Sequence, residues 1–202
     1  MPPTPTSDDP DYLRGHWDAE YEAGRWDFLR GLKQLSRSGL IAAWLKEAGA
    51  LGHVLDVGCG EALLHPFLKP YGMARYTGVD VSPKALDLAR ARTGPDDTLV
   101  EATLEGFEAG DTRYSAVVFN EVLYFPRDPA GELRRYRAFL APGGVIAISM
   151  YAPNRPESGA HKAIAAVWAE TDGDGWTVLD DLTIHGEIKD VTWKLRLVQR
   201  KD

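Results

Sequence analysis

Short apolar runs, each followed by a glycine-containing or polar segment, recur along the 202 residues of this chain. Runs of this length predict buried strands of a parallel sheet, because strands covered on both faces lose the alternation of apolar and polar positions. We expect five such strands, over residues 54–57, 76–81, 98–102, 116–119 and 145–151. Helical segments between them predict an α/β fold with helices on both faces of the sheet.

The last two predicted strands, residues 176–188 and 191–198, are joined by almost no connecting chain. Parallel neighbours need a crossover of about a dozen residues, so we expect these two strands to be antiparallel. Val191, Trp193 and Leu195 alternate with polar residues in strand period. The chain therefore predicts a seven-stranded, mostly parallel sheet with an antiparallel final strand.

Helix boundaries are predicted from serine and proline. Ser82 followed by Pro83 is a strong helix start, with serine as the N-cap and proline in the first turn. Pro66 is acceptable only near a helix start, so the preceding helix should begin near Leu64. Further helices are expected over residues 32–48, 128–140 and 160–170.

Two of these helices carry patterns that predict which side chains are buried. In the helix of residues 32–48 the expected apolar stripe is Leu32, Leu35, Leu40, Ala43, Trp44 and Ala48. In the helix of residues 128–140, Leu133, Tyr136 and Leu140 are expected to face the core. The neighbouring Arg134, Arg135 and Arg137 should then form a solvated outer face.

Composition narrows the possible partners. The formal net charge of -7 disfavours nucleic acid, which usually requires a basic surface. No apolar run approaches the ~20 residues of a membrane helix, and one cysteine excludes an internal disulfide. We expect a flexible tail over residues 1–10, a single domain over 11–202, no membrane contact and a cytoplasmic location.

A glycine-rich turn follows the first predicted strand, where residues 56–60 read Asp-Val-Gly-Cys-Gly. Glycine lets the backbone approach a ligand closely, which makes Gly58 and Gly60 candidates for ligand contact. Asp80 ends the second predicted strand, 20 residues after Gly60. A carboxylate at this place can accept hydrogen bonds from both hydroxyls of a ribose. These features together predict a site for an adenosine-containing cofactor.

Three more segments complete a recognisable series: Tyr-Thr-Gly-Val-Asp-Val-Ser at 76–82, Ala-Val-Val-Phe-Asn-Glu at 116–121 and Leu-Ala-Pro-Gly-Gly at 140–144. With the glycine turn, they resemble the class I S-adenosylmethionine-dependent methyltransferases over about residues 12–200. Residues 26–29 and 120–125 are similar to a small-molecule branch that includes the nodulation N-methyltransferases. The resemblance implies a Rossmann-like fold, S-adenosyl-L-methionine as cofactor and a small-molecule methyl acceptor.

The resemblance implies cofactor contacts from strand ends and from an N-terminal aromatic lid within residues 11–48: Trp17, Tyr21, Trp26, Asp56, Gly58, Cys59, Gly60, Asp80, Val81, Thr103, Leu104 and Asn120. The chain departs from the family pattern at two positions. Ala62 replaces a frequent glycine, which is tolerable if the backbone there is helical. Thr103 replaces a frequent acid that binds the adenine amino group.

Glu121, Tyr124 and His185 are the candidate catalytic residues. In-line displacement at the activated methyl group mainly requires alignment, and a base matters more when the acceptor is a hydroxyl than when it is an amine. Glu121 could serve as that base, orient a cationic acceptor or only cap a turn. His185 and His161 lie in segments able to reach the acceptor side. The five histidines show no metal-ligand spacing, so no metal is expected.

Three alternatives remain open from the residues. A macromolecular methyltransferase is disfavoured by the acidic charge and by residues 120–123, which lack the Pro-Pro-aromatic motif of amino methyltransferases acting on bases. A cofactor-binding protein that transfers no methyl group is compatible with every motif. A nicotinamide dehydrogenase could also use Asp80, but the final antiparallel strands argue against it.

Overall fold

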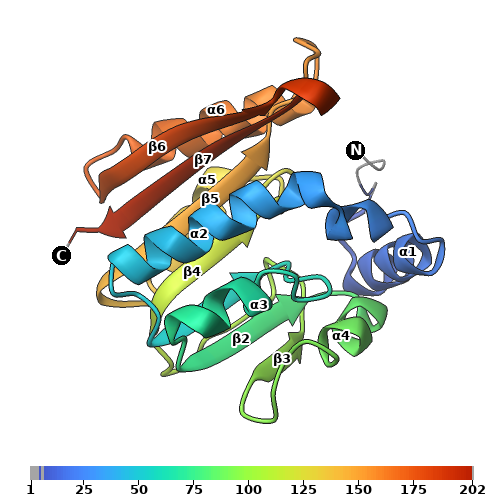
Figure 1. The fold of residues 1–202 in the computed structure, drawn as a ribbon, viewed down its shortest axis with the longest axis horizontal. Coiled ribbons are helices and arrows are strands. Elements are labelled where there is room, and N and C mark those ends of the chain that lie inside the picture. Colours follow the sequence, from blue (N-terminus) through green and yellow to red (C-terminus); the bar gives the residue numbers. More distant parts are fainter. Residues whose placement is uncertain (1–4, 6, 202) are drawn as a thin grey trace.

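The computed structural model describes residue 5 and residues 7–201. One seven-stranded sheet with the order β3-β2-β1-β4-β5-β7-β6 crosses the molecule. Figure 1 shows this sheet, with the N-terminal helix α1 set apart at one end of the strands. The strands are β1 (His53–Val57), β2 (Arg75–Asp80), β3 (Thr98–Glu101), β4 (Tyr114–Asn120), β5 (Leu140–Tyr151), β6 (Trp176–Gly186) and β7 (Val191–Arg200).

Strand pairing confirms the predicted topology. β1 pairs in parallel with both β2 and β4. β2 also pairs in parallel with β3, and β4 pairs in parallel with β5. β7 is antiparallel to β5 on one side and to β6 on the other. The sheet is therefore parallel except for its final strand.

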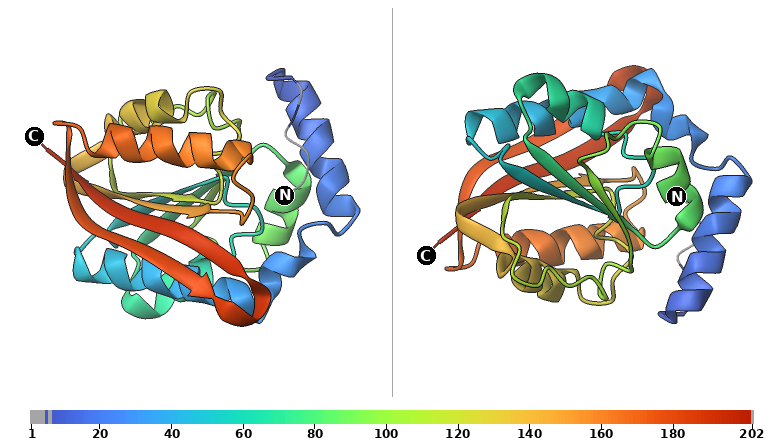
Figure 2. Two further views of the ribbon diagram at one scale, coloured as in Figure 1. Left: turned by 90° about the horizontal axis from the view of Figure 1, so that it is seen from above. Right: turned by 90° about the horizontal axis from the view of Figure 1, so that it is seen from below.

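Helices cover both faces of the sheet, as Figure 2 shows. On one face lie α2 and α3, and on the other lie α5 and α6. The helices are α1 (Pro10–Glu22), α2 (Leu35–Glu47), α3 (His65–Leu68), α4 (Pro83–Ala89), α5 (Pro129–Arg137) and α6 (Gly159–Thr171). Short 3-10 turns are η1 (Asp27–Arg30), η2 (Leu32–Gln34), η3 (Lys69–Tyr71) and η4 (Glu187–Lys189).

The core is divided by the sheet into two apolar layers. Val118 of β4 packs in the layer beneath α2 and α3, while its neighbour Phe119 packs in the layer beneath α5 and α6. Successive strand residues point to opposite faces, so a strand covered on both sides is apolar at every position. This explains the continuous apolar runs of the sequence.

The predicted starts of α4 and α3 are confirmed. Ser82 is the N-cap of α4, and its Oγ accepts a hydrogen bond of 3.1 Å from the Ala85 N–H. Pro66 lies in the first turn of α3, which begins at His65. α1 begins at Pro10, where Asp9 caps it, so the helix includes one residue assigned to the tail. Residues 1–4 and 6 of that predicted tail lie outside the described residues.

The predicted apolar stripe of α2 is wrong at four of its six positions. Leu32, Leu35, Ala43 and Ala48 are exposed, whereas Trp44 is buried and Leu40 packs against the core. The side chains of Leu32 and Leu35 are 84% and 41% exposed, and Ile41 and Leu45 are fully buried instead. The first two residues belong to η2 and the start of α2, before the helix reaches the sheet. The buried face continues toward the helix start with polar side chains, which the apolar pattern could not identify.

The helix predicted over residues 128–140 ends earlier than expected. α5 ends at Arg137, and Leu140 already starts β5, so the glycines at 143 and 144 lie within a strand. Leu133, Tyr136 and Leu140 are fully buried, as predicted.

The basic cluster of α5 is solvated at Arg134, as predicted, but Arg135 and Arg137 are only partly exposed. The Arg135 guanidinium donates hydrogen bonds to the Phe107 and Leu104 carbonyls, and Arg134 pairs with Glu170 at 2.5 Å. These arginines therefore bind neighbouring protein groups.

Within residues 5 and 7–201, none of the helices combines the length and the apolar character that a membrane span requires.

Replacing Ile41 tests the corrected orientation of α2. Ile41→Ala should lower the free energy of unfolding by about 2–5 kcal/mol, because it opens a cavity in the core. Leu35→Ala is the matched control and should cost well below that range. Denaturant unfolding of both variants measures the difference, and equal losses would contradict the assigned helix face.

Candidate functional site

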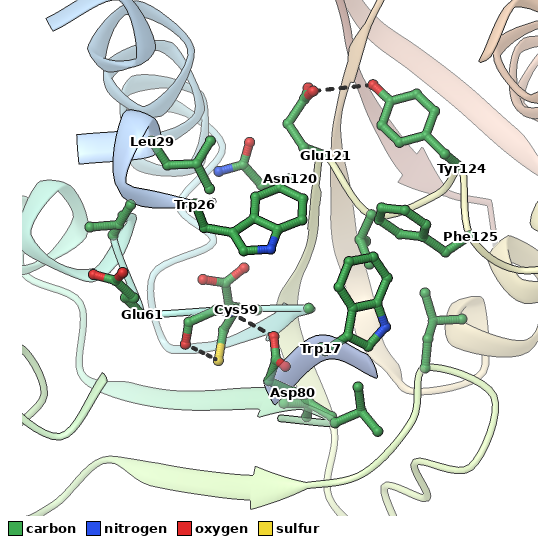
Figure 3. A pocket seen from close by; sticks show the side chains of 18 of the residues that line it. Trp17, Trp26, Leu29, Cys59, Glu61, Asp80, Asn120, Glu121, Tyr124 and Phe125 are labelled. Atoms are coloured by element: carbon green, nitrogen blue, oxygen red, sulfur yellow. Dashed lines mark hydrogen bonds between the residues drawn. The ribbon is translucent and has the colours of Figure 1, made fainter. Parts of the chain in front are cut away.

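A cavity of about 390 Å³ opens at the carboxyl ends of the parallel strands, beneath α1 and η1. Open α/β sheets bind ligands at this edge. The cavity lining includes every predicted site residue except His185. In Figure 3, Glu121 and Tyr124 lie on one side of the Trp26 indole, and Cys59 and Asp80 lie on the other.

The turn after β1 is built from glycines that no other residue can replace without strain. Gly58 and Gly60 have φ angles of 65° and 53°, in the left-handed region that favours glycine. A Cβ atom on Gly58 would lie 2.5 Å from Val122 Cγ2. On Gly60 it would lie 2.5 Å from the Tyr21 hydroxyl oxygen. Both glycines therefore permit close approach of other groups to the backbone.

Asp80 connects the end of β2 to this turn. Its Oδ2 accepts a 2.8 Å hydrogen bond from the Gly60 N–H, and its Oδ1 accepts a 2.9 Å bond from the Ser82 N–H. Burial raises the pKa of Asp80 to about 6, although these N–H donors favour the charged form. A carboxylate has about four lone-pair sites, so Asp80 can accept further hydrogen bonds from a ligand in the cavity.

Asp56 lies deeper, at 2% exposure, and accepts a 2.8 Å hydrogen bond from the Tyr76 hydroxyl. Burial raises the pKa of Asp56 to about 7, and the nearby Asp80 adds to this effect. A positively charged ligand group near both acids would favour their ionised forms. Cys59, between the two glycines, is buried, and burial raises the pKa of its thiol, which disfavours the reactive thiolate.

The expectation for Ala62 is wrong. Its φ angle is 54°, so the backbone is left-handed and not helical. The position thus has the conformation for which glycine is favoured, and alanine adopts it under strain. The Ala62 side chain is fully buried in the core layer beneath α2 and α3, which gives its methyl group a packing role.

The loop after β3 forms one end of the cavity. Thr103 and Leu104 of this loop line the cavity, together with Val81, which follows β2. The Thr103 Oγ1 accepts a hydrogen bond from the Gly106 N–H. The Leu104 carbonyl accepts hydrogen bonds from Arg135 and, at 2.8 Å, from the Tyr136 hydroxyl. α5 therefore holds this loop in position.

The end of β4 brings Asn120, Glu121 and Tyr124 to the other end of the cavity. Glu121 has a φ angle of 69°. Its Oε1 accepts a 2.8 Å hydrogen bond from the Ser149 hydroxyl, and its Oε2 accepts bonds from the Tyr124 hydroxyl and the Tyr151 N–H. Burial raises the pKa of Glu121. This carboxylate joins β4 to β5 and keeps one lone-pair site on Oε1 for another donor.

Aromatic side chains of α1 and the following turn cover the cavity. Trp17 contacts Phe125 edge-on at 4.8 Å between ring centroids, and Trp26 lies 6.2 Å from Tyr21 in a stacked arrangement. The Trp26 Nε1–H is buried and has no hydrogen-bond partner within residues 5 and 7–201. Buried donors are nearly always paired, so this indole is suited to donate to a bound ligand.

Two polar contacts attach this aromatic cover to the segments that follow β1 and β2. Asp18 of α1 accepts hydrogen bonds from the Ser82 hydroxyl at 2.5 Å and from the Lys84 N–H at 3.1 Å. Arg30 of η1 forms a two-point contact with the buried Glu61, at 2.9 and 2.6 Å. The cover is thus fixed at the ends of β1 and β2.

The structure does not bring the two candidate histidines to the cavity. His185 is exposed on β6, where its Nδ1 lies 2.9 Å from the Thr192 Oγ1. His161 lies against the Pro153 and Arg155 carbonyls. β6 is the edge strand beyond β7, so His185 lies one strand further from the cavity than Trp193, which lines it. No metal-binding group of three His, Cys, Asp or Glu occurs within the part of the chain described.

Sequence reasoning missed Gln34 and Arg37, which are buried and line the cavity. Both lie on the face that carries Ile41 and Leu45 further along α2. Residues three and four apart share a helix face, so extending the true apolar face toward the helix start would have placed two polar residues inside. That combination is the signal that could have identified them.

Residues 19–185 match the family model described as a methyltransferase domain. The match covers most of the chain, so the protein belongs to this family.

Curated relatives match the chain in part. The ubiquinone biosynthesis O-methyltransferase of Cereibacter sphaeroides (strain ATCC 17025 / ATH 2.4.3) is 30% identical over 118 residues, which cover 57% of this chain and 47% of that protein. The trans-aconitate 2-methyltransferase of Paracidovorax citrulli is 33% identical over 140 residues, covering 64% of this chain and 51% of that protein. The chain thus spans about half the length of these relatives.

Solved structures share the fold. The N-methyltransferase NodS from Bradyrhizobium japonicum WM9, in complex with S-adenosyl-L-homocysteine, has a TM-score of 0.72 at 19% identity, covering 88% of this chain and 92% of that one. The 1,6-didemethyltoxoflavin-N1-methyltransferase of Burkholderia thailandensis has a TM-score of 0.73 at 20% identity, covering 99% and 93%.

The pH dependence of stability in the Asp56→Asn variant tests the protonation state of the buried Asp56. With a folded pKa of about 7, Asp56 stays protonated in the folded state while the unfolded chain ionises above about pH 4. The free energy of unfolding therefore falls as the pH rises from about 4 to 7, because only the unfolded chain loses the Asp56 proton in this range.

The neutral amide removes this effect. The stability of Asp56→Asn relative to wild type should rise by up to about 4 kcal/mol between about pH 4 and pH 8. Denaturant unfolding across that range provides the measurement, with Asp87→Asn on the exposed side of α4 as control. A difference that does not change with pH would contradict the assigned titration.

Proposed function

We propose that this protein transfers the methyl group of S-adenosylmethionine to a nitrogen or oxygen atom of a small metabolite. The observation that carries the proposal is the Asp80 carboxylate, which is bonded to the Gly60 N–H across a glycine turn in the cavity. This arrangement suits a ribose held beside closely approached backbone. Family membership and the cofactor products named in related structures support the same conclusion.

The cavity residues fit this cofactor. Asp80 would accept hydrogen bonds from the ribose hydroxyls, and the backbone N–H of Leu104, which lines the cavity, would donate to the adenine edge. The turn of Gly58 and Gly60 would face the amino-acid portion with backbone alone, since both glycines line the cavity and carry no side chain. The unpaired Trp26 Nε1–H supplies a donor from the cover.

S-adenosylmethionine, when bound, supplies a methyl group on positively charged sulfur: the acceptor's electron pair forms the new bond to carbon, and sulfur keeps the pair of the broken bond. The chain's residues mainly fix the reacting groups in line, which can contribute about 7–11 kcal/mol. Trp17, Tyr21 and Trp26 exclude water and offer aromatic faces to a cation. Glu121 can take the proton of a hydroxyl acceptor at Oε1, and Tyr124 holds that carboxylate.

The remaining assignments are part of the same proposal. Residues 11–48 would act as the lid of a single methyltransferase domain, since α1 and η1 cover the cavity. The acceptor would be a small molecule and not a nucleic acid, because the net charge is -7. A cytoplasmic location is proposed as well.

Asp80→Ala should weaken binding of S-adenosylhomocysteine about a hundredfold or more, since charge-assisted hydrogen bonds contribute about 1.5–3 kcal/mol each. Calorimetry on the full chain measures the affinity, and the melting temperature shows whether the variant is folded. Asp87→Ala, on the exposed side of α4, is the matched control. Unchanged affinity in a folded Asp80→Ala variant would contradict the proposed cofactor site.

Methyl transfer itself is tested with methyl-labelled S-adenosylmethionine and a protein-free metabolite extract. We expect a labelled small molecule that disappears when Asp80→Ala replaces the wild-type protein. Label in added RNA or protein instead would indicate a macromolecular acceptor. Binding of S-adenosylhomocysteine without transfer to any acceptor would leave only the cofactor-binding part of the proposal.

A further inference from the structure

Glu121 follows the end of β4, lines the cavity and has a carboxylate held in one orientation. Oε1 accepts the Ser149 hydroxyl at 2.8 Å, and Oε2 accepts the Tyr124 hydroxyl at 3.2 Å and the Tyr151 N–H at 3.1 Å. Each carboxylate oxygen has about two lone-pair sites, so Oε1 keeps one for a ligand. The Glu121 φ of 69° is rare for a residue with a side chain, and such backbone strain concentrates at functional sites.

The open site on Glu121 lies away from the residues assigned to the ribose. In Figure 3, Glu121 and Tyr124 lie on one side of the Trp26 indole, and Asp80 lies on the other. Tyr151, at the end of β5, also lines the cavity. Its half-buried ring packs against the core and stacks on no other ring among residues 5 and 7–201. A flat group placed against Tyr151 lies close to Glu121, because the Tyr151 N–H bonds to that carboxylate.

The charges around Glu121 favour a neutral donor. Burial raises the pKa of Glu121, and Arg37 is the main opposite charge that offsets this rise. A cationic acceptor would be attracted to Glu121 but repelled by Arg37, since like charges at short range repel. A protonated amine also has no free electron pair with which to attack the methyl group. A neutral hydroxyl or a neutral amine meets neither obstacle.

The fixed carboxylate favours a hydroxyl over an amine. A neutral amine attacks with a pair that is already free, whereas a hydroxyl must lose its proton, and a base accelerates that loss. The acidity of the hydroxyl decides which kind a carboxylate can serve. A phenol such as tyrosine ionises at about pH 10, and bulk water ionises only at about pH 15.7. A hydroxyl on an aromatic ring is therefore the better match for Glu121.

We propose that the methyl acceptor is a hydroxyl group on an aromatic ring, with Glu121 as its catalytic base and Tyr151 as the surface that holds the ring. The inference rests on the proposed function. The O–H bond breaks and its proton passes to Glu121 Oε1, an electron pair of that oxygen forms the bond to the methyl carbon, and the carbon–sulfur pair stays on sulfur. The proton leaves Glu121 for water when the product departs. Offset stacking on Tyr151 orients the acceptor ring.

The test uses the full chain, S-adenosylmethionine with an isotope-labelled methyl group and a protein-free metabolite extract. NMR spectroscopy of the labelled product identifies the atom that carries the methyl group and the protons beside it. We expect the methyl group on an oxygen attached to an aromatic ring. A methyl group on nitrogen, on a carboxylate or on the oxygen of a saturated carbon would overturn the inference and leave the proposed function intact. A methyl group on sulfur or carbon would contradict both.

Glu121→Gln keeps the shape of the side chain but cannot take a proton. It should lower kcat for the purified acceptor by about a hundredfold or more. Its affinity for S-adenosylhomocysteine should stay within about twofold of wild type. Glu47→Gln, at the exposed end of α2, is the matched control and should equal wild type in both measurements. A folded Glu121→Gln variant with wild-type kcat, or with a comparable loss of cofactor-product affinity, would overturn the assignment of Glu121 to the acceptor.

The pH dependence of kcat separates a base from a merely structural residue. The deficit of Glu121→Gln should shrink as the pH rises from about 7 to 10, because a ring hydroxyl then loses its proton to the solvent. Arg37, Tyr124 and Tyr151 are the titratable residues around Glu121, and the wild-type and variant proteins share them. A deficit that stays constant over this range would contradict the role of Glu121 as base.

Tyr151→Leu tests the binding of the ring and keeps the backbone N–H that holds Glu121. It should raise KM for the acceptor about two- to tenfold with little change in kcat, because stacking is lost and the base remains. An unchanged KM would overturn the role of Tyr151. If the melting temperature shows that Glu121→Gln is unfolded, the product structure and Tyr151→Leu still test the inference. No labelled product at all, with cofactor binding preserved, would contradict the proposed function itself.

Discussion

The hydrogen bond from the Gly60 N–H to Asp80 joins the ends of β1 and β2, and the geometry of the cavity depends on it. It holds a turn whose glycines adopt left-handed conformations, and it fixes a carboxylate at the edge where parallel strands meet. The same carboxylate accepts the Ser82 N–H, and Ser82 in turn caps α4 and binds Asp18 of the cover. One acid therefore connects the turn, the following helix and α1.

The cavity is divided according to the strand order. β1, β2 and β3 supply the turn, Asp80 and the Leu104 loop, while β4, β5 and β7 supply Glu121, Tyr151 and Trp193. The antiparallel β7 contributes to this edge because its first residues, not its last, lie there. The two halves also differ in charge, since carboxylates dominate the first and the buried Arg37 stands in the second. Such a division suits two ligands held side by side.

Local patterns were sufficient for most of the fold. Apolar run lengths, the Ser82-Pro83 start and the missing crossover before residue 191 each depend on neighbouring residues, so the strand topology and the α4 start were predictable. Errors arose where distant packing decides. The face of α2 was misassigned because its buried side continues with Gln34 and Arg37, and the left-handed backbone of Ala62 follows from the turn around it.

By itself the sequence determined the half of the cavity formed by β1 and β2, because a glycine turn and an acid at fixed spacing are consequences of one β-α-β unit. Only the tertiary structure added Arg37 and Trp193 to the half formed by β4, β5 and β7. Residues as distant as Arg37, Asn120 and Trp193 meet there, and His185, close to Trp193 in sequence, is excluded by its edge strand. The physical reason is that contacts between elements depend on how helices and strands pack, which no spacing along the chain encodes.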